Sequence, residues 1–468
     1  EKINMRYLSS VIAVILATTT TTTTAFSAPS KTKVPSWETL ESILSPTITK
    51  TKPNTYTYSE TQNNPSILLN NNNQYVFYRD TNAQCPYAQR VHLALELKQL
   101  DYTTVLQTPR NNKEDKHGGP LLGLPDGTLI YDSIQALEEI QKISSDVSPN
   151  LFPRVSGSVD GVRANINRRS YIFPRNTIFL EGVVPSLFKN NAENDDGTVE
   201  MVAKSNHDVT CEEIDEMLEE YPDGPFLCGE PISACDISWM PFVERYVSQL
   251  PLLYPEVKPR SDFEEIKVWL DAMERLNPCY SCVVRGDAMT YGMQLVNALK
   301  KKQKEGVLKM DDSTISIMEK SVSTTEDPIG IKRKRRGIVY NPSNVWSTYA
   351  QNKDYLANTP HEECASCLVK LRHDLFDQIT DQWCKEEGRD KEDMDMALRQ
   401  VINCILTDFT SSEDEFCFVD GALSKLSGDA RDVASMVNEC ISVPRDMGAI
   451  PASVLRKLVL DAPKPRIL

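Results

Sequence analysis

The sequence predicts a mixed α/β domain over residues 73–146, followed by an all-α domain and a further helical extension. Two observations carry this prediction. Short runs rich in β-branched and aromatic residues alternate with helical patterns in the order strand, helix, strand, hairpin, helix. Over residues 155–300, and again over 359–460, the apolar residues follow only the helical period, with polar breaks between the patterned stretches. The first of these orders is the layout of a thioredoxin-like domain.

Local signals define each predicted element of the α/β domain. Residues 75–78 (YVFY) are an aromatic and β-branched run typical of a buried strand, and residues 86–99 repeat apolar residues at helical spacing. A turn at Pro125-Asp126-Gly127 separates the two strands of the hairpin. The remaining elements are three strands and a helix, at 102–106, 120–122, 128–131 and 132–143.

Changes in composition along the chain suggest its segments. We divide it into a targeting segment at 1–33, a linker at 34–72, the thioredoxin-like domain at 73–146, the all-α domain at 147–300, a charged linker at 301–358 and the helical extension at 359–468. Residues 34–40 can start a short helix inside the first linker. The second linker is rich in charge and poor in periodicity, so we expect loop or partial disorder there.

The composition is that of a globular protein, with 40% hydrophobic and 25% charged residues. The formal net charge of −15 argues against nucleic-acid binding, because that function needs a basic face. The 12 cysteines are scattered without the dense spacing of a disulfide framework, so we expect most of them to be reduced thiols. After the targeting segment, no stretch is apolar enough to suggest a membrane span.

The targeting segment has the features of a signal peptide followed by a second address. Residues 8–17 are an apolar run that fits a signal-peptide core and is too short to span a bilayer. After a run of Thr, Phe26 stands in the stretch AFSAP at 25–29, before a basic stretch rich in Ser and Thr. This bipartite arrangement resembles the plastid-targeting sequences of diatoms and related algae. We therefore expect a plastid (chloroplast) location, with the secretory pathway as the alternative.

Cys85 is the candidate catalytic residue. It stands directly before the first predicted helix, and Pro86 suits the first helical turn. Exposed N–H groups at a helix start stabilise a thiolate, so we expect a pKa below that of an ordinary thiol, with help from Arg79 or Arg90. Position 88 is Ala, so Cys85 lacks a C-x-x-C partner, and a mixed disulfide formed there needs an external thiol to resolve it.

Two further features belong to the same predicted site. Pro120 starts the third strand, where the thioredoxin-like layout has a cis-proline facing the reactive Cys, and it leaves the backbone of Gly119 able to pair with a peptide. Asp132 and Ser133 open the last helix of the domain, where N–H groups bind carboxylates and an acidic side chain can hold an ammonium group. Glutathione carries both of these charges at its γ-glutamyl end, so glutathione is the external thiol we expect.

These motifs together resemble the N-terminal domain of glutathione transferases. The resemblance lies in CPYAQR at 85–90, in the Gly-Pro pair before the third strand and in DG-x-x-x-YDS at 126–133. The Cys-Pro-aromatic start is closest to the omega, dehydroascorbate-reductase and lambda classes, which use Cys. The resemblance implies that Cys85 forms a mixed disulfide with glutathione. It also implies a glutathione-binding set that consists of Pro86, Tyr87, Gly119, Pro120, Asp132 and Ser133.

Later stretches support the resemblance. Residues 224–237 match the family's FLxG…S-x-x-D segment, in which Ser233 and Asp236 are expected to form a capping box on a buried helix. Residues 269–287 resemble the family's last core helix and its following turn. Residues 441–458 resemble the end of plastid and algal glutathione-transferase-like proteins with long extensions. This likeness assigns the extension to a family but does not indicate its function.

Three other motifs have plainer interpretations. The pairs Cys279/Cys282 and Cys364/Cys367 have a C-x-x-C spacing that suits zinc or redox chemistry, but both fall in helical patterns, so we expect no metal. The basic run at 332–336 fits a solvated loop, or docking on the acidic remainder of the chain, better than a nuclear signal.

The sequence therefore predicts a glutathione S-transferase-like enzyme, a glutathione-dependent thiol transferase or reductase that acts on a small oxidised or electrophilic acceptor. Conjugation of glutathione to an electrophile is an alternative that the Cys disfavours, because Cys traps glutathione covalently. A non-catalytic binding module is the second alternative. It is left open by Gly119, where the family has an aliphatic residue, and because only Lys113 and Lys116 offer a cation for the glycine carboxylate. The family resemblance also allows a homodimer.

Overall fold

The computed structural model describes residues 34–48, 55–63, 74–107, 119–153, 162, 166, 211–253, 262–306, 310–335, 338–385, 389–412 and 414–462. The targeting segment and the candidate cations Lys113 and Lys116 lie outside these residues. All described residues belong to one structural unit, Val34–Leu468. No helix in the described ranges is long and apolar enough to cross a membrane.

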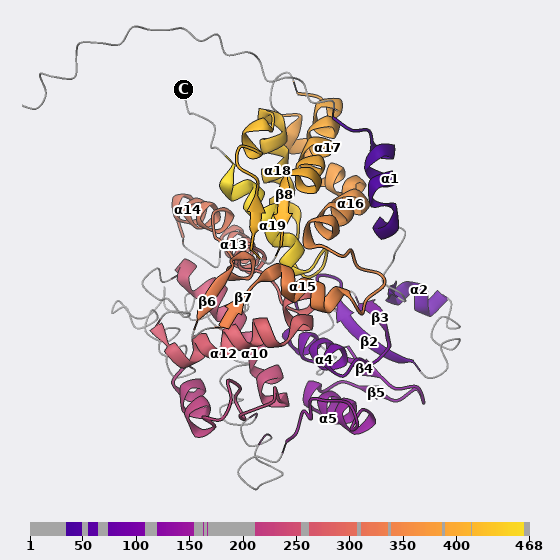
Figure 1. Ribbon diagram of the computed structural model, residues 1–468, viewed down its shortest axis with the longest axis vertical. Helices are drawn as coiled ribbons and strands as arrows, with labels where there is room; N and C mark the ends of the chain where they lie inside the picture. Colours follow the sequence, from indigo (N-terminus) through magenta and orange to yellow (C-terminus); the bar gives the residue numbers. More distant parts are fainter. Residues whose placement is uncertain are drawn as a thin grey trace, which may run out of the picture. The chain divides into compact units, whose positions relative to one another are not determined.

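A five-stranded sheet forms the centre of the first domain, with strand order β1-β3-β2-β4-β5 (Figure 1). β2 (Tyr75–Asp80) runs parallel to β3 (Tyr102–Gln107) on one side and antiparallel to β4 (Leu122–Gly123) on the other. β4 pairs antiparallel with β5 (Leu129–Ile130). Phe77 on β2 lies opposite Thr104 and Leu122, and all three side chains are buried.

Two helices complete this domain. α4 (Pro86–Leu97) connects β2 to β3, and α5 (Ser133–Ile143) follows β5 and packs beside α4. Phe77 stacks on His92 of α4, with ring centroids 5.1 Å apart, so the sheet and the helix share one apolar layer. The strand, helix, strand, hairpin, helix order confirms the predicted thioredoxin-like fold class.

The fifth strand corrects the expected linker at 34–72. β1 (Thr55–Thr57) pairs parallel with β3, with Tyr56 opposite Val105, and α2 (Tyr58–Asn63) follows it. β1 therefore widens the sheet beyond the elements that the sequence predicted. A strand of three residues has no periodicity of its own, and it is stabilised by its pairing with β3.

The all-α domain packs against α4 through α10. Its described helices are a segment at 211–220, α10 (Ala234–Leu253), α12 (Glu264–Leu276), the short π-helix η1 (Tyr280–Val284) and α13 (Ala288–Lys304). α10 contacts both α4 and α13, so it lies between the first domain and the rest of the helices. This position brings polar residues of α10 behind the loop that carries Cys85.

Ser233 and Asp236 lie at the start of α10, where Ser233 donates two hydrogen bonds to the Asp236 carboxylate. The Asp236 carboxylate accepts from the backbone N–H and the hydroxyl of Ser233, each at 2.8 Å. It also accepts from the N–H of Leu227 (2.8 Å) and from Nε1 of Trp269 (2.9 Å). Because the carboxylate is fully buried and has these four donors, its role is to fix the start of the helix.

Regular structure occupies much of the range 301–358, where the sequence suggested a charged linker. α14 (Asp312–Ser323) is capped by Asp311, whose carboxylate accepts from the N–H of Thr314 at 2.7 Å. The elements that follow are η2 (Pro328–Gly330), β6 (Arg333–Arg335), β7 (Ile338–Tyr340) and α15 (Pro342–Ala350). β6 and β7 form an antiparallel hairpin that contains part of the basic run.

Arg333 explains why this segment folds. Its guanidinium forms an ion pair with Asp271 at 3.1 Å and a second one with Glu274, both on α12. The carboxylate of Glu274 is also paired with Arg285, at 3.4 Å. The basic run therefore docks on acidic side chains at Arg333, as one of its two sequence interpretations proposed, and such distant partners are invisible to local periodicity.

The remaining elements form the C-terminal extension. They are α16 (Pro360–Trp383), α17 (Lys391–Asp408), β8 (Phe409–Ser411), β9 (Phe416–Phe418), η3 (Leu423–Lys425), α18 (Gly428–Cys440) and α19 (Ala449–Asp461). α1 (Trp37–Ile48), from the N-terminal part of the chain, packs on α16 (Figure 1). Nε1 of Trp37 donates to Asp395 at 2.6 Å, and Glu41 pairs with Arg372 at 2.8 Å.

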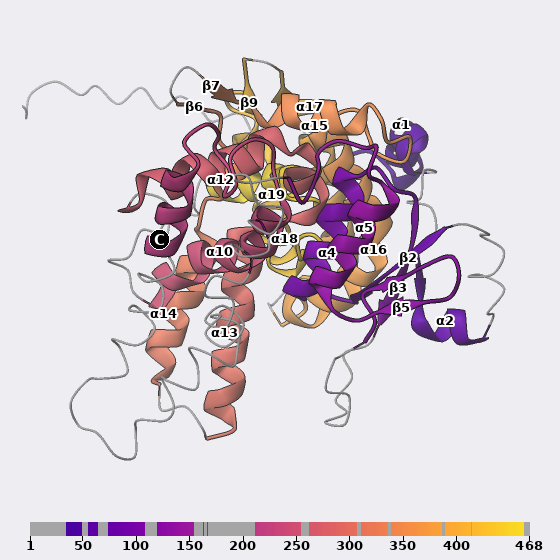
Figure 2. The same ribbon diagram turned by 90° about the horizontal axis from the view of Figure 1, so that it is seen from below.

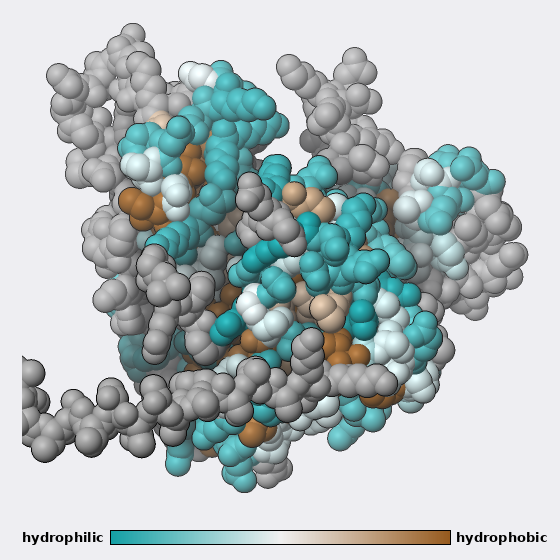
Figure 3. Space-filling model, turned by 90° about the horizontal axis from the view of Figure 1, so that it is seen from above, coloured by the Kyte–Doolittle hydropathy of each residue, from teal (hydrophilic) through white to brown (hydrophobic). Residues whose placement is uncertain are grey.

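The extension and the helix before it, α15, are each anchored on one of the two preceding domains. Arg456 of α19 donates to the carboxylate of Asp287, the residue that caps α13, at 3.0 Å. Tyr349 of α15 donates to Glu96 of α4 at 2.8 Å. Figure 2 shows α15 and α16 on the side of the molecule that carries α4 and α5. On the face drawn in Figure 3, hydrophobic residues form separate patches between hydrophilic ones, and many of the apolar side chains lie in the shared core.

Candidate functional site

Cys85 is placed at the first turn of α4, as the sequence predicted. It is the N-cap residue, with extended backbone (φ −69°, ψ 117°), and Pro86 occupies the first helical position. Cys85 as a whole residue is partly exposed, whereas Pro86 and Ala88 are buried. Cys85 is therefore held at the boundary between the apolar core and the protein surface.

The loop before Cys85 is fixed by Asp80. The Asp80 carboxylate accepts from the backbone N–H of Gln84 at 2.9 Å and of Cys85 at 3.0 Å. Ala83 takes up a left-handed conformation with φ 54°, which is uncommon for a residue with a Cβ. The carboxylate thus orders the loop, but it also places a negative charge beside the thiol.

The pKa of Cys85 is raised, so the predicted lowering was wrong. Burial is the largest cause, and the neighbouring Asp80 carboxylate adds to it. The backbone N–H groups of Ala88 and Tyr87 and the cation of Arg245 act in the opposite direction. The helix start therefore does stabilise the thiolate, but burial and a nearby anion, neither visible from the sequence, outweigh it.

Arg90 joins three helices around the site. Its guanidinium donates to the hydroxyl of Ser133 at 3.0 Å and to the carbonyl of Ser238 at 2.7 and 3.0 Å. It also lies 4.9 Å from the ring centroid of Phe242 and 5.3 Å from that of Tyr87. Burial lowers the pKa of Arg90 to about 10. Arg90 therefore links α4, α5 and α10, and the Cys85 thiolate is among the negative groups that raise its pKa, an attraction in the direction expected for help to the thiolate.

Gly119 and Pro120 lie beside β3, but they differ from the expected clamp. The cis peptide bonds in the described residues precede Pro149, Pro231 and Pro444, so the expected cis bond before Pro120 is a further correction. The amide of Gln107 lies against Gly119, where a Cβ would come within 1.9 Å of its Oε1. An aliphatic residue at position 119 would therefore have to displace the flexible end of the Gln107 side chain. A peptide that pairs with Gly119 must displace the Gln107 side chain.

Asp132 and Ser133 already have partners within the protein. Asp132 caps α5, and its Oδ1 accepts from the N–H groups of Ile134 and Gln135, each at 2.9 Å. The hydroxyl of Ser133 is buried and accepts from Arg90. A γ-glutamyl group at this helix start would have to share these N–H groups with the Asp132 side chain.

The sequence reasoning missed a charged pair that lies behind the site. Glu244 and Arg245 are buried on α10, 3.2 Å apart, and Arg245 reaches the carbonyl of Gln84 in the Cys85 loop at 2.9 Å. Gln89 of α4 bonds to both of them. The signal was available in the sequence, because two charges interrupt the apolar run ISWMPFVERYV at 237–247.

Neither C-x-x-C pair has features of a reactive or metal-binding site. Cys279, Cys282, Cys364 and Cys367 are buried, and burial is the main cause that raises the pKa of each thiol, that of Cys364 to about 12. Within the described part of the chain, no group of His, Cys, Asp and Glu side chains is arranged to hold a metal ion.

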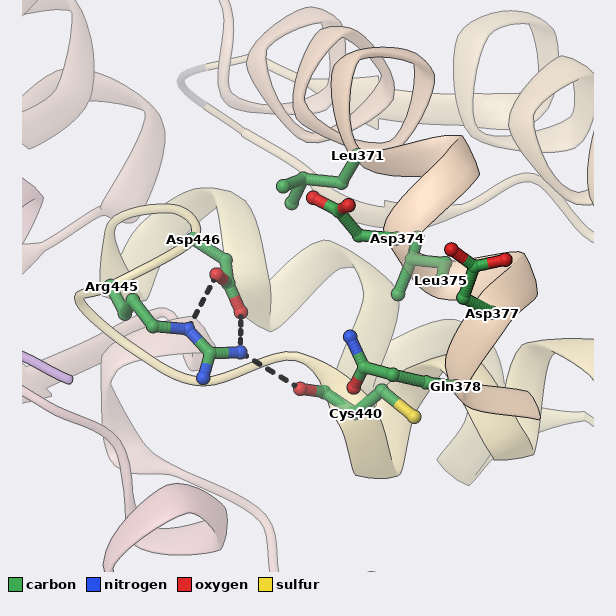
Figure 4. Close-up of a pocket in the computed structure, with 8 residues that line it drawn as sticks. All are labelled: Leu371, Asp374, Leu375, Asp377, Gln378, Cys440, Arg445 and Asp446. Atoms are coloured by element: carbon green, nitrogen blue, oxygen red, sulfur yellow. Dashed lines mark hydrogen bonds and ion pairs between the residues drawn. The ribbon is translucent and has the colours of Figure 1, made fainter. Parts of the chain in front are cut away.

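A separate cavity of about 370 Å³ lies within the extension, between α16 and the segment from α18 to α19 (Figure 4). Arg445 and Asp446 form an ion pair at its edge (2.7 Å), and Asp374 and Asp377 face it from α16. Cys440 also lines the cavity, and burial raises its pKa. The lining is mainly polar, and it shares no residue with the site around Cys85.

The comparisons with known proteins agree with this geometry in the first domain. Residues 84–143 match the family described as glutathione S-transferase, N-terminal domain. This range begins one residue before Cys85 and ends with the last residue of α5. The first domain is therefore a thioredoxin-fold domain similar to that of glutathione transferases. No match was found among curated proteins.

Solved glutathione transferases resemble the chain only distantly. The trimeric glutathione transferase TDR1 of Leishmania is 18% identical, with 50% of each chain covered and a TM-score of 0.39, so the chain spans half the length of that protein. The Tau class enzyme of mango, Mangifera indica, is 17% identical over 43% of this chain and 88% of its own, with a TM-score of 0.35. Omega 3C of Trametes versicolor is 16% identical over 45% and 90%, with a TM-score of 0.32. Likenesses this distant carry no information about substrate or mechanism.

Proposed function

We propose that this protein is a glutathione-dependent thiol transferase of the Cys type, in which Cys85 forms a mixed disulfide with glutathione. The observation that supports it best is the placement of Cys85: a partly exposed cysteine at the start of α4, with the N–H groups of Tyr87 and Ala88 stabilising its thiolate. Position 88 is Ala, so a second thiol of the same helix turn cannot resolve the intermediate.

The proposed reaction has two exchange steps. The Cys85 thiolate attacks the glutathionyl sulfur of a glutathionylated acceptor, the acceptor leaves as a thiolate that takes up a proton, and the Cys85–glutathione disulfide forms. The thiolate of a free glutathione then attacks the glutathione sulfur of that disulfide. This second step releases oxidised glutathione and the Cys85 thiolate. In the net reaction one free glutathione is consumed, and the glutathionyl group of the acceptor supplies the other half of the oxidised glutathione.

Binding of glutathione in the expected place requires small rearrangements. The tripeptide backbone would pair with Gly119 once the amide of Gln107 moves aside, and the γ-glutamyl carboxylate would lie at the start of α5 near Ser133. Pro86 and Tyr87 form the adjoining edge, where Tyr87 is partly exposed and packs on Phe242. The expected glutathione-binding residues follow the end of β2, precede β4 or follow β5, so they belong to the loops and helix starts at one edge of the sheet.

The direct test uses wild type, Cys85→Ser and the matched control Cys384→Ser, because Cys384 is an exposed thiol at the end of α16. For each protein we measure the glutathione-dependent reduction of dehydroascorbate and of a mixed disulfide between a small thiol and glutathione. We expect the activity to be lost in Cys85→Ser and kept in Cys384→Ser. Equal activity in wild type and Cys85→Ser would refute the proposal.

A non-catalytic binding module is the second candidate, and specific observations favour it. The pKa of Cys85 is raised, Gln107 lies against Gly119, and the side chain of Asp132 occupies N–H groups of α5. Each of these would slow or weaken a glutathione reaction without preventing binding. Retention on glutathione resin together with no turnover, in protein whose fold is intact, would favour the module over the enzyme. Turnover with a conjugated electrophile would instead favour the conjugating transferase.

The location and assembly of the protein are also proposals. The signal-peptide-like run and Phe26 support delivery to a plastid. Residues 1–33 fused to a fluorescent protein in diatom cells would test this, with Phe26→Ala as the variant that should remain outside the plastid. Secretion of the unmodified fusion would contradict it. Sedimentation of residues 34–468 would decide whether the protein forms a homodimer.

A further inference from the structure

We infer that Arg245 of α10 is a positioning residue for Cys85, which holds the loop that carries the thiol and supports the thiolate form with its charge. This inference rests on the proposed function, because it takes Cys85 as the reacting group. It assigns to the all-α domain a direct part in the chemistry of the first domain. Arg245 touches the backbone beside Cys85 and no reacting atom, so its action is exerted through Cys85.

The guanidinium of Arg245 bridges α10 to two points around Cys85. Nη2 donates to the carbonyl of Gln84, the residue immediately before Cys85, at 2.9 Å. Nη1 donates to Oε1 of Gln89, one helical turn after Cys85, at 2.9 Å. The two bonds hold the loop and the first turn of α4 in one arrangement, because the planar fork of Arg fixes the geometry between its donors.

Arg245 is itself held in place by partners from several elements. Its side chain is 1% exposed, and Nη1 lies 3.2 Å from Oε1 of Glu244. Tyr280 of η1 donates to Oε2 of Glu244 at 2.7 Å, and Tyr291 of α13 donates to Oε1. The guanidinium also lies 4.7 Å from the ring centroid of Tyr291. A cation held from three sides in a site of low dielectric has a fixed and weakly screened effect on its neighbours.

The charges around the thiol make this cation relevant. Asp80 places an anion against the loop on the other side, with its carboxylate on the N–H of Cys85. Arg245 is a side-chain cation that lowers the pKa of Cys85, and Arg90 of α4 also interacts electrostatically with the thiol. Asp80 and Arg245 therefore act in opposition on the same sulfur, and the loss of Arg245 removes part of the positive charge that offsets the Asp80 carboxylate.

The experiment measures the alkylation rate of Cys85 by iodoacetamide as a function of pH, with peptide mass spectrometry to follow Cys85 alone. The variants are Arg245→Met and Arg245→Lys. Arg245→Met removes both the positive charge and the two hydrogen-bond donors of the guanidinium, whereas Arg245→Lys keeps the charge without that pair of donors. Arg285→Met is the matched control, because Arg285 is also buried and ion-paired, to Asp327 at 3.0 Å, without a bond to the Cys85 loop.

We expect Arg245→Met to move the midpoint of the pH profile upward by about one unit, which is about a tenfold slower reaction at pH 7. Arg245→Lys should restore part of the rate. Arg285→Met should lower the thermal midpoint and leave the profile unchanged. A profile of folded Arg245→Met that coincides with that of wild type would overturn the inference.

A second variant keeps the test decisive if Arg245→Met does not fold. Glu244→Gln keeps the side-chain shape and removes the anion paired with Arg245, so the midpoint should move downward and the reaction at pH 7 should accelerate. General loosening of the structure does not produce this direction, and an unchanged or raised midpoint would overturn the inference. Alkylation needs no glutathione, so these results are separate from the proposed function. If the pH profile of Arg245→Met shifts but the protein has no transferase activity, the inference about Arg245 stands and the proposed enzymatic function is rejected. If the activity depends on Cys85 but the profile does not shift, the proposed function stands and the inference is rejected.

Discussion

Glu96 of α4 connects the segment 342–353, which precedes the extension, to the first domain, and this contact gives a quantitative prediction. The Glu96 side chain is 2% exposed, and its Oε2 accepts from the hydroxyl of Tyr349 at 2.8 Å and from Nζ of Lys353 at 3.1 Å. Its Oε1 accepts from Tyr102 of β3 at 2.6 Å. One carboxylate thus connects the sheet of the first domain to α15 and to the turn after it.

The perturbation is a double-mutant cycle between Glu96→Gln and Tyr349→Phe. A hydrogen bond to a charged group contributes about 1.5–3 kcal/mol, so Tyr349→Phe should lower the free energy of unfolding by about that amount. Glu96→Gln removes the charge from three donors at once and should cost about 3–5 kcal/mol. Because the two side chains share one bond, we expect a coupling energy of about 1–3 kcal/mol between them.

Urea unfolding followed by tryptophan fluorescence measures the free energies, and hydrogen exchange of residues 342–350 reports the docking of α15. Glu96→Gln should speed exchange in α15 ahead of global unfolding. Tyr102→Phe is the matched control, because Tyr102 also donates to Glu96 but belongs to the first domain, so it should lower stability without a selective effect on α15. A coupling energy below about 0.5 kcal/mol would refute the reasoning, since that is the range for independent sites.

Three further predictions follow from the same structure. Gly448→Ala should lose about 3 kcal/mol or more of unfolding free energy, because its Cβ would lie 1.6 Å from the carbonyl oxygen of Cys282, whereas Gly428→Ala, with no atom within 4 Å, should change it by less than about 1 kcal/mol in thermal or urea unfolding. Because the pKa of Cys85 is raised, its alkylation rate should rise more steeply between pH 8 and pH 9 than that of free cysteine, whose pKa of about 8.5 makes its rate begin to level off there; a plateau below pH 8 would contradict this. Ala83→Gly should raise the unfolding free energy by up to about 1 kcal/mol, since it relieves about 1–2 kcal/mol of left-handed strain at a smaller cost in chain entropy, and a clear loss of stability would contradict this account of the loop.

Local pattern predicted the first domain because its strands and helices are locally consistent. The buried run at the start of β2, the helical period of α4 and the turn before β5 each appear in the sequence, and the placement of Cys85 at a helix start followed from Pro86 and that period. The order of these elements then restricted the fold to a thioredoxin-like layout.

What the sequence could not provide is set by contacts between distant residues. β1 depends on β3 across 48 residues of chain, from Tyr56 to Val105, and the basic hairpin depends on the pairing of Arg333 with α12. Neither partner is marked by local periodicity. The same cause explains why part of each expected linker proved to be regular structure.

The position of Cys85 at the start of a helix was predicted, but the electrostatics around it were not. The sequence showed a thiol beside helix N–H groups, and these groups do act on Cys85 in the expected direction. Three features of the site depend on tertiary structure. They are the extent to which Cys85 is buried, the position of the Asp80 carboxylate, and the contact of Arg245 of α10 with the Cys85 loop. The direction of the pKa shift is a sum over these distant contributions, so it could not be read from the motif.

Peptide mass mapping after incubation with oxidised glutathione at pH 8 tests the central claim most directly. The protein contains exposed Cys384 as well as partly exposed Cys85, so the experiment compares two accessible thiols in one molecule. Our account predicts one glutathionyl adduct that accumulates first on the peptide of Cys85 and is removed by added glutathione. An adduct confined to Cys384, or none on Cys85 in folded protein, would contradict it.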